Sequence, residues 1–330
     1  MAIEDDMLQA EPGHAPVALV PHDGRAGHLR QAAALARALG MHAAVLPTPL
    51  RMPWRGLAPR NAPLGWALHR REWSPLPERP PRVIIGCGRR SALAGLWLRE
   101  HWGGTPALVQ ILDCGLPPGR FDAVIVPRHD RLRGERVITM TGSLNPVDEA
   151  WLAAGAGAWR ELAELPVPRV TVLLGGPARG TDFRRAASPA VLARWGDDIA
   201  ARNGSLVLVA SPRTPPGWLD AVADGWAGIP AARLDWPASE PRYASALAHA
   251  THLLVTADST NLLSEACATG RPVAVLGGET ARGRRAGLLE SLREAGPLVD
   301  VDEWLDHGPV EPLREAPRVA ESLRGLLGAR

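Results

Sequence analysis

The sequence predicts an α/β protein made of two similar-sized, doubly wound halves whose parallel sheets face each other across a cleft. Short apolar runs alternate with helical stretches along most of the chain, which is the pattern of parallel sheets. The same alternation begins again after Pro166 and Pro168. A chain of 330 residues is also long for one domain and sufficient for two.

The first half is expected to span residues 16–165, after a disordered tail at 1–15 that has no apolar segment and so resembles neither a secretory signal nor a transit peptide. Its strands are predicted at 17–20, 42–46, 83–85, 107–112 and 121–126, and its main helices at 29–39, 91–101 and 147–165. The last helix is interpreted as a linker. Residues 47–81 are rich in Pro, Trp and Arg, and are expected to form an exposed loop with a short helix at 64–71.

The second half is expected to span residues 166–330. Its strands are predicted at 170–174, 206–210, 253–255 and 273–276, with helices between them and closing helices at 288–295 and 319–327. Whether the last helix packs back on the first half is left open.

The composition is that of an ordinary soluble globular protein, with 46% hydrophobic and 22% charged residues. No apolar run approaches the roughly 18 residues of a membrane span, so a cytoplasmic and bacterial protein is expected. All 37 basic residues are arginine, and Trp (12) far outnumbers Tyr (1) and Phe (2). These skews are typical of a GC-biased genome, and no basic run is interleaved with aromatics, so a nucleic-acid partner is not expected.

The sequence offers no pattern of metal-binding or disulfide-forming residues. Cys87, Cys114 and Cys267 are far apart and form no CxxC pair, which suits a reducing compartment. His249 and His252 lack the glutamate of the zincin pattern, and the DxD string at 300–302 is interpreted as chance. Neither a metal nor a cofactor is therefore expected.

The most informative stretch is 255–275, which reads VTADSTNLLSEACATGRPVAV. A strand, a polar turn, a helix and a second strand follow one another here, and anions bind readily where a strand ends and a helix begins. Ser259, Thr260 and Ser264 would add hydroxyl donors, and Glu265 could accept from a ribose diol. We interpret the stretch, with Asp258 and Asn261 in its turn, as a cradle for a nucleoside diphosphate. The alternative is that Asp258 or Ser259 merely caps the helix.

Two further loops of the second half are expected at the same sheet edge. One contains Gly175, Gly176 and Arg179, and the other contains Ser211, Arg213 and Thr214. Glycines let backbone N–H groups approach phosphate oxygens, and arginine offers a planar fork of donors. A tight turn and a solvated surface charge are the structural alternatives for these residues.

In the first half, Asp23, Arg25 and His28 share one turn between a strand and a helix. Histidine is well suited to proton transfer near neutral pH, so His28 or Asp23 could act as a general base; the alternative is a helix cap and a solvated histidine. Gly86-x-Gly88 resembles half of a dinucleotide fingerprint, but Ser91 occupies the third glycine position. A dehydrogenase is therefore only a minor alternative.

The chain resembles the bacterial relatives of the plant "elongated mitochondria" fission factor, a group regarded as GT-B-type glycosyltransferases. The similar segments, in chain order, are DGRAGHLRQ (23–31), GCGRRS (86–91), QILD (110–113), PRHD (127–130), LLGGP (173–177), SPRTP (211–215) and TADSTNLLSEACATGRPV (256–273). The resemblance implies two Rossmann-like domains of the GT-B type, a nucleotide-sugar donor in the C-terminal one, and no metal requirement. One departure is the segment Ala281-Arg282-Gly283-Arg284-Arg285, which replaces a His/Phe-rich piece of the family.

The functional hypothesis is a glycosyltransferase that moves a sugar from a nucleoside-diphosphate donor to a cell-envelope glycan or lipid acceptor. In it, Gly175, Gly176, Arg179, Ser211, Arg213, Thr214 and residues 258–261 and 264–265 bind the donor, while His28 or Asp23 is the base. A non-hydrolysing nucleotide-sugar epimerase and a non-catalytic adaptor are the alternatives. A peripheral contact with the inner membrane through Trp54, Trp66 and Trp73 is weighed against a solvated loop with partly buried tryptophans. The sequence does not indicate an oligomeric state.

Overall fold

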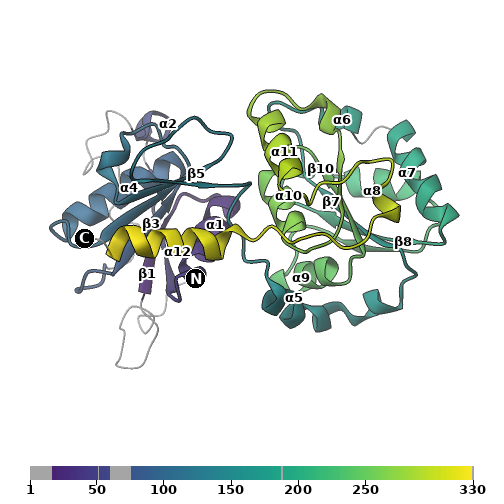
Figure 1. Ribbon diagram of the computed structural model, residues 1–330, viewed down its shortest axis with the longest axis horizontal. Coiled ribbons are helices and arrows are strands. Elements are labelled where there is room, and N and C mark those ends of the chain that lie inside the picture. Colours follow the sequence, from purple (N-terminus) through teal and green to yellow (C-terminus); the bar gives the residue numbers. More distant parts are fainter. Residues whose placement is uncertain (1–16, 51, 60–75, 187–188, 329–330) are drawn as a thin grey trace. The chain divides into compact units, whose positions relative to one another are not determined.

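The computed structural model describes residues 17–50, 52–59, 76–186 and 189–328 (Figure 1). The chain forms two compact units: one comprises residues through Pro146 together with the segment from Glu315 onward, and the other comprises Val147–Arg314. The expected tail at 1–15 and the expected helix at 64–71, with Trp66 and Trp73, lie outside the described residues.

Unit 1 is a six-stranded parallel sheet in the order β2-β1-β3-β4-β5-β6. Its strands are β1 (Val17–His22), β2 (His42–Pro47), β3 (Val83–Cys87), β4 (Ala107–Ile111), β5 (Ala123–Pro127) and β6 (Val137–Met140). Its helices are α1 (Ala26–Ala38), α2 (Trp54–Leu57), α4 (Gly88–His101), the 3-10 turn η3 (Pro118–Arg120) and α12 (Glu315–Gly328).

Helices cover both faces of this sheet because β3 and β5 are buried along their whole length and present apolar side chains to either side. Leu35 of α1 and Leu323 of α12 share one core with Ile85. Leu98 of α4 and Phe121 share the core of the opposite face with Ile84. The C-terminal helix, yellow in Figure 1, thus packs with the N-terminal elements, which answers the question that the sequence left open.

Unit 2 is a five-stranded parallel sheet in the order β11-β10-β7-β8-β9. Its strands are β7 (Arg169–Leu174), β8 (Ser205–Ala210), β9 (Ala231–Leu234), β10 (His252–Thr256) and β11 (Val273–Leu276). Its helices are α5 (Glu149–Ala156), α6 (Phe183–Ala186), α7 (Pro189–Ala201), α8 (Trp218–Gly225), α9 (Glu240–Ala248), α10 (Thr260–Cys267) and α11 (Arg284–Glu294), with 3-10 turns η4 (Gly157–Glu164), η5 (Gly278–Thr280) and η6 (Trp304–Asp306).

The segment 147–165 differs from the linker helix expected at the end of the first half. It consists of α5 and the 3-10 segment η4, with a break at Trp159 (φ −149°, ψ 71°), and it belongs to unit 2. The reason is packing: a Cβ on Gly155 would lie only 2.2 Å from Cβ of Ala244, so α5 approaches α9 closely. Trp151 and Leu162 are buried in the unit 2 core.

Two strands were not predicted, β6 and β9, and both lie at the edge of their sheet. Edge strands are covered less completely, and the residues of β6 and β9 are mostly half-buried or exposed. They therefore lack the continuous apolar run by which the central strands are recognised. A further difference is that α4 begins at Gly88, directly after β3, so GCGRRS contains no intervening loop.

Each sheet has one point at which the order of its strands reverses. In unit 1 the chain moves from β1 to β2 on one side and continues with β3 on the other side of β1. In unit 2 it moves from β7 through β8 and β9 and returns with β10 on the other side of β7. Open α/β sheets bind ligands outside the carboxyl ends of their strands at such switch points. The turns after β1, β3, β7 and β10 are therefore the places to look for function.

Candidate functional site

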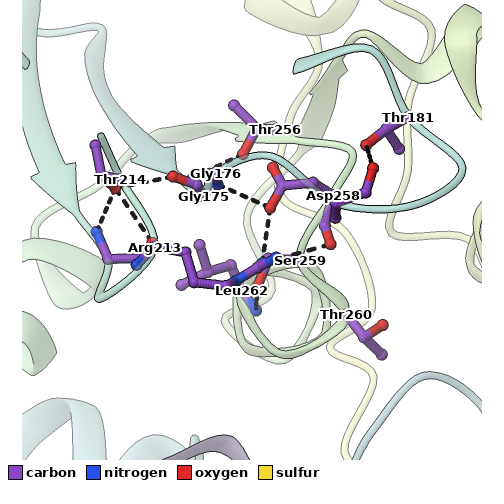
Figure 2. Close-up of polar contacts among 12 residues, drawn as sticks. Gly175, Gly176, Thr181, Arg213, Thr214, Thr256, Asp258, Ser259, Thr260 and Leu262 are labelled. Carbon is purple, nitrogen blue, oxygen red and sulfur yellow. Dashed lines mark hydrogen bonds and ion pairs between the residues drawn. The ribbon is translucent and has the colours of Figure 1, made fainter. Parts of the chain in front are cut away.

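The unit 2 switch point is organised by a buried carboxylate. Asp258 follows β10 by two residues and its side chain is 1% exposed. Its Oδ2 accepts a hydrogen bond from the N–H of Gly176 at 2.9 Å and one from Nη2 of Arg213 at 2.7 Å (Figure 2). Asp258 therefore ties together the loops that follow β7, β8 and β10. Its Oδ1 is buried and accepts no hydrogen bond from a described residue.

The two glycines of the loop after β7 are required for close approach. A Cβ on Gly175 would lie 2.2 Å from Oδ2 of Asp258, and one on Gly176 would lie 1.9 Å from the backbone O of Arg213. Their N–H groups are already used within the protein, because Gly175 donates to Oγ1 of Thr256 at 2.8 Å and Gly176 donates to Asp258. The expectation that these N–H groups point to a ligand is therefore not met.

Ser211 and Thr214 hold the loop after β8 in place. The Thr214 hydroxyl lies 2.7 Å from the carbonyl O of Leu174 and accepts from the N–H of Ser211 at 2.8 Å. Oγ of Ser211 accepts from the N–H of Arg213 at 3.2 Å. Ser211 and Thr214, both predicted as site residues, therefore fix the conformation of the loop. The group that this loop can offer to a ligand is the guanidinium of Arg213, which is 44% exposed.

The start of α10 has an N-cap residue and is contacted by a charged side chain from another helix. Oγ of Ser259 accepts from the N–H of Leu262 at 3.5 Å, so Ser259 is the N-cap (Figure 2). Oγ of Ser264 donates to the carbonyl O of Thr260 at 2.8 Å. Oγ1 of Thr260 in turn accepts from Nη1 of Arg285 at 2.7 Å. Asn261 is half-buried in the first turn, and Arg179 is exposed on the loop after β7.

Arg285 is a site residue that the sequence did not single out. Burial lowers the pKa of its guanidinium; the carboxylate of Asp258 opposes this effect and the charge of Arg213 adds to it. No carboxylate forms an ion pair with Arg285 within the part of the chain that the structure describes. One positive charge is thus left uncompensated at the start of α10. The only signal in the sequence was the arginine-rich segment 282–285, whose partner lies 25 residues earlier.

Glu265, the residue expected to accept from a ribose, is 2% exposed in the second turn of α10. Its Oε2 accepts from the hydroxyl of Tyr243, on α9, at 2.5 Å. Nothing in its geometry therefore singles out a ribose as its partner.

The unit 1 switch point contains an Asp–His pair. Nδ1 of His28 lies 3.2 Å from each carboxylate oxygen of Asp23, and the side chains are 17% and 2% exposed. Burial by itself raises the pKa of Asp23, but the hydrogen bond and charge of His28 and the N–H and charge of Arg25 outweigh it, so that the pKa of Asp23 is lowered. A carboxylate that holds one ring nitrogen orients the other to exchange a proton.

Gly88 makes this arrangement possible. It has a φ of +79° at the first position of α4, and a Cβ there would lie 2.4 Å from Cε1 of His28. The imidazole therefore packs directly on the start of α4, in space that a larger residue would fill. The two residues predicted as general bases, Asp23 and His28, are thus brought together where β1, α1 and α4 meet at the switch point.

No group of three or more His, Cys, Asp or Glu side chains within the described residues could hold a metal ion. No helix within the same residues is long and apolar enough to cross a membrane.

The chain is similar to known proteins in sequence and to solved structures in fold. The chain is 29% identical over 282 residues to the mitochondrial fission protein ELM1 of Arabidopsis thaliana, a match that covers 76% of this chain and only 65% of that protein. It is 23% identical over 290 residues to an uncharacterized protein of Rickettsia prowazekii, covering 75% of this chain and 80% of that one.

Among solved structures, the UDP-GlcNAc 2-epimerase of Neisseria meningitidis bound to UDP-GlcNAc superposes with a TM-score of 0.51 at 11% identity, covering 95% of this chain and 100% of that one. At this identity the likeness concerns the fold, which is the expected GT-B-like pair of Rossmann-like domains. The model of the family described as "Mitochondrial fission ELM1" matches residues 26–327. The resemblance noted in the sequence is thereby confirmed, and the chain belongs to the Mitochondrial fission ELM1 family.

Proposed function

We propose that unit 2 binds the diphosphate of a nucleotide-sugar at the start of α10 and that the protein transfers the sugar to a hydroxyl of a cell-envelope glycan or lipid. The observation that carries the proposal is the pair of guanidiniums, Arg213 and Arg285, that flank the N-terminus of α10 at a sheet switch point. Asp258 compensates one of these two charges. The second charge and the positive end of the helix dipole favour an anion there.

In this proposal, catalysis consists of proton removal in unit 1 and charge stabilisation in unit 2. The acceptor hydroxyl oxygen bonds to the anomeric carbon while its proton passes to Nε2 of His28, whose Nδ1 is held by Asp23. The bond between the anomeric carbon and the β-phosphate oxygen breaks, and its electron pair leaves with the nucleoside diphosphate. Arg285, Arg213 and the start of α10 stabilise the negative charge that develops on that leaving group.

The donor site is tested by thermal-shift measurements with UDP, GDP, CDP and TDP and with their sugars. At about 100 times its dissociation constant, one ligand is expected to stabilise the protein by roughly 2.7 kcal/mol. Arg285→Gln should weaken binding of that ligand about tenfold or more, because a charged hydrogen bond is lost. The matched control is Arg293→Gln, which changes an exposed residue in the last turn of α11, the helix that also contains Arg285. This variant should bind the nucleotide as wild type does.

Three outcomes would contradict this function. Equal affinity of Arg285→Gln and wild type for the nucleotide would show that the donor does not bind at the start of α10. Accumulation of an isomerised free nucleotide-sugar without any acceptor would identify a non-hydrolysing epimerase. Absence of binding across the whole panel would favour a non-catalytic interaction role.

A further inference from the structure

A buried amide connects strand β4 to the start of α4, where the His28 ring packs. Gln110 is a fully buried polar residue of this inner strand, and such residues need hydrogen-bond partners within the protein. Its Nε2 lies 2.7 Å from the carbonyl O of Ile111 and 3.3 Å from those of Gly88 and Leu112. Carbonyl oxygens only accept, so they fix which end of the amide faces them. Gln110 thereby links the end of β4 to the first residue of α4.

The glycine opposite Gln110 leaves room for this amide. Gly86 of β3 is paired in register with Gln110 of β4, so the two residues face the same side of the sheet. A Cβ on Gly86 would lie 3.0 Å from Oε1 of Gln110, which is tighter than most contacts of a Cβ. Gly88, two residues later, leaves room for the His28 ring in the same way. The two glycines of Gly86-x-Gly88 therefore accommodate two side chains of this protein, Gln110 and His28.

The Gln110 amide also holds two backbone positions of unusual conformation. Gly88 has a φ of +79° and Leu112 has a φ of +69°, and a residue other than glycine is strained in this left-handed region. The carbonyl groups of both residues accept from Nε2 of Gln110, and the N–H of Leu112 donates to the carbonyl O of Ile125 at 2.8 Å. Such strain persists only where surrounding contacts hold it, and it is concentrated at functional sites. These contacts keep the end of β4 and the first peptide of α4 in one conformation.

We propose that Gln110 is a positioning residue for the His28 base: its amide fixes the Gly88 peptide, and this peptide sets where the imidazole lies. The ring packs against Gly88 and is held at Nδ1 by both oxygens of Asp23, each at 3.2 Å. An ionised carboxylate can only accept, so Nδ1 carries the proton and Nε2 is left to take one. The role of Gln110 in turnover rests on the proposed transferase function, whereas its effect on the ring does not.

The test replaces Gln110 by methionine, which keeps the length of the unbranched side chain and removes both N–H donors. The tautomer of His28 is read by long-range proton–nitrogen correlation NMR at a pH where the ring is neutral, and its signals are assigned by their loss in His28→Asn. Wild type is expected to show the tautomer with the proton on Nδ1. In Gln110→Met the signals of the two ring nitrogens should shift towards each other, because a displaced ring loses its hydrogen bond to Asp23 and samples both tautomers.

The matched control is Thr171→Val in unit 2. Thr171 is a fully buried residue of β7 whose Oγ1 donates to the carbonyl O of Ala246 at 2.9 Å, so this variant also loses a buried side-chain hydrogen bond to a carbonyl. Its urea midpoint should fall as that of Gln110→Met does, while its His28 signals should remain those of wild type. A wild-type His28 spectrum in Gln110→Met, or the same tautomer change in Thr171→Val, would overturn the proposal.

Gly86→Ala tests the same contact by a second route, and decides the matter if Gln110→Met does not fold. The added Cβ displaces the amide of Gln110 without removing it. A smaller change of the His28 signals in the same direction is therefore expected. An unchanged His28 spectrum in Gly86→Ala would contradict the proposal.

Turnover separates this proposal from the proposed function. Gln110→Met should lower kcat for sugar transfer about tenfold or more, because a misplacement of about 1 Å can cost about a hundredfold in rate. KM for the nucleotide-sugar should stay that of wild type, since the donor is bound in unit 2. A raised KM with an unchanged kcat would contradict a role of Gln110 at the base. If wild type transfers no sugar, the transferase function is wrong, and the tautomer of His28 in Gln110→Met still decides whether Gln110 positions the ring.

Discussion

The two units place a buried aspartate at the same point of the same kind of sheet, but they pair it with different partners. Asp258 in unit 2 binds an arginine and a backbone N–H, Arg213 and Gly176. Asp23 in unit 1 binds a histidine, His28. An arginine is always charged, whereas a histidine changes its charge near neutral pH. The first pair therefore suits a permanent anion site, and the second suits proton transfer.

The glycines beside the Asp258–Arg213 and Asp23–His28 pairs differ in a parallel way. Gly176 is confined by the backbone of Arg213, which cannot move independently of its loop. Gly88 is confined by the imidazole of His28, a side chain that can rotate. Substitutions in unit 2 should therefore affect folding most, and substitutions in unit 1 should affect chemistry most. The following predictions test this contrast, beginning with the largest expected effect.

Replacing the base should abolish turnover without unfolding the protein. His28→Asn is expected to lower the rate of sugar transfer about a thousandfold, because a positioned general base contributes roughly that factor. The rate is measured with the nucleotide-sugar found by thermal shift, and His42→Asn, an exposed histidine at the start of β2, is the control. A loss of less than tenfold would show that another group takes the proton.

Filling the space beside the unit 2 aspartate should be the most destabilising glycine substitution. Gly176→Ala places a Cβ 1.9 Å from a backbone oxygen, and the expected cost is about 3 kcal/mol of unfolding free energy. Urea denaturation measures it. Gly157→Ala is the control in the same unit, since a Cβ there meets no atom within 4 Å. Equal midpoints for the two variants would contradict the close approach.

Neutralising the unit 2 aspartate should lower the free energy of unfolding by a somewhat smaller amount. Asp258→Asn removes the charge that faces Arg213, and a hydrogen bond to a charged group contributes about 2 kcal/mol. The surface pair of Asp220 with Arg233 offers a comparison, because Asp220→Asn should cost at most about 1 kcal/mol. Urea midpoints that rank the two variants in the reverse order would show that Asp258 does not organise its loops.

The corresponding substitution in unit 1 should separate stability from activity. Gly88→Ala should cost only about 1 kcal/mol, mainly for the positive φ, since the His28 ring can move aside. Turnover should nevertheless fall towards that of His28→Asn, because the displaced ring no longer lies at the start of α4. Normal turnover in a folded Gly88→Ala protein would show that catalysis does not depend on the position of the His28 ring.

The smallest effect is a pH dependence of stability from the Asp23–His28 pair. Because folding lowers the pKa of Asp23, this contribution is complete above the ordinary aspartate pKa of about 4 and is lost as the pH falls through the lowered value. The difference in urea midpoint between wild type and Asp23→Asn should therefore shrink below about pH 4. Glu100→Gln, an exposed position on α4, serves as control. A difference in midpoint that grows on acidification would contradict the lowered pKa of Asp23.

Much of this molecule could be predicted from local patterns. Apolar runs such as those of β3 and β7 are buried along their whole length, so the sequence alone indicates parallel central strands with helices on both faces. Asp23 and His28 lie five residues apart, so their pairing across one turn is also a local property. The polar turn after β10 was found for the same reason, because strand, turn and helix follow one another directly.

Tertiary structure decided what depends on distant parts of the chain. It assigned the N–H of Gly176 to Asp258, 82 residues away, and brought Arg285 to Thr260. It also returned α12 to unit 1, and it packed α5 against α9 through Gly155 and Ala244. Periodicity and turn chemistry report which face of an element is apolar and where the element ends. They contain no information about which buried partner meets that face, because this choice depends on the packing of the whole unit.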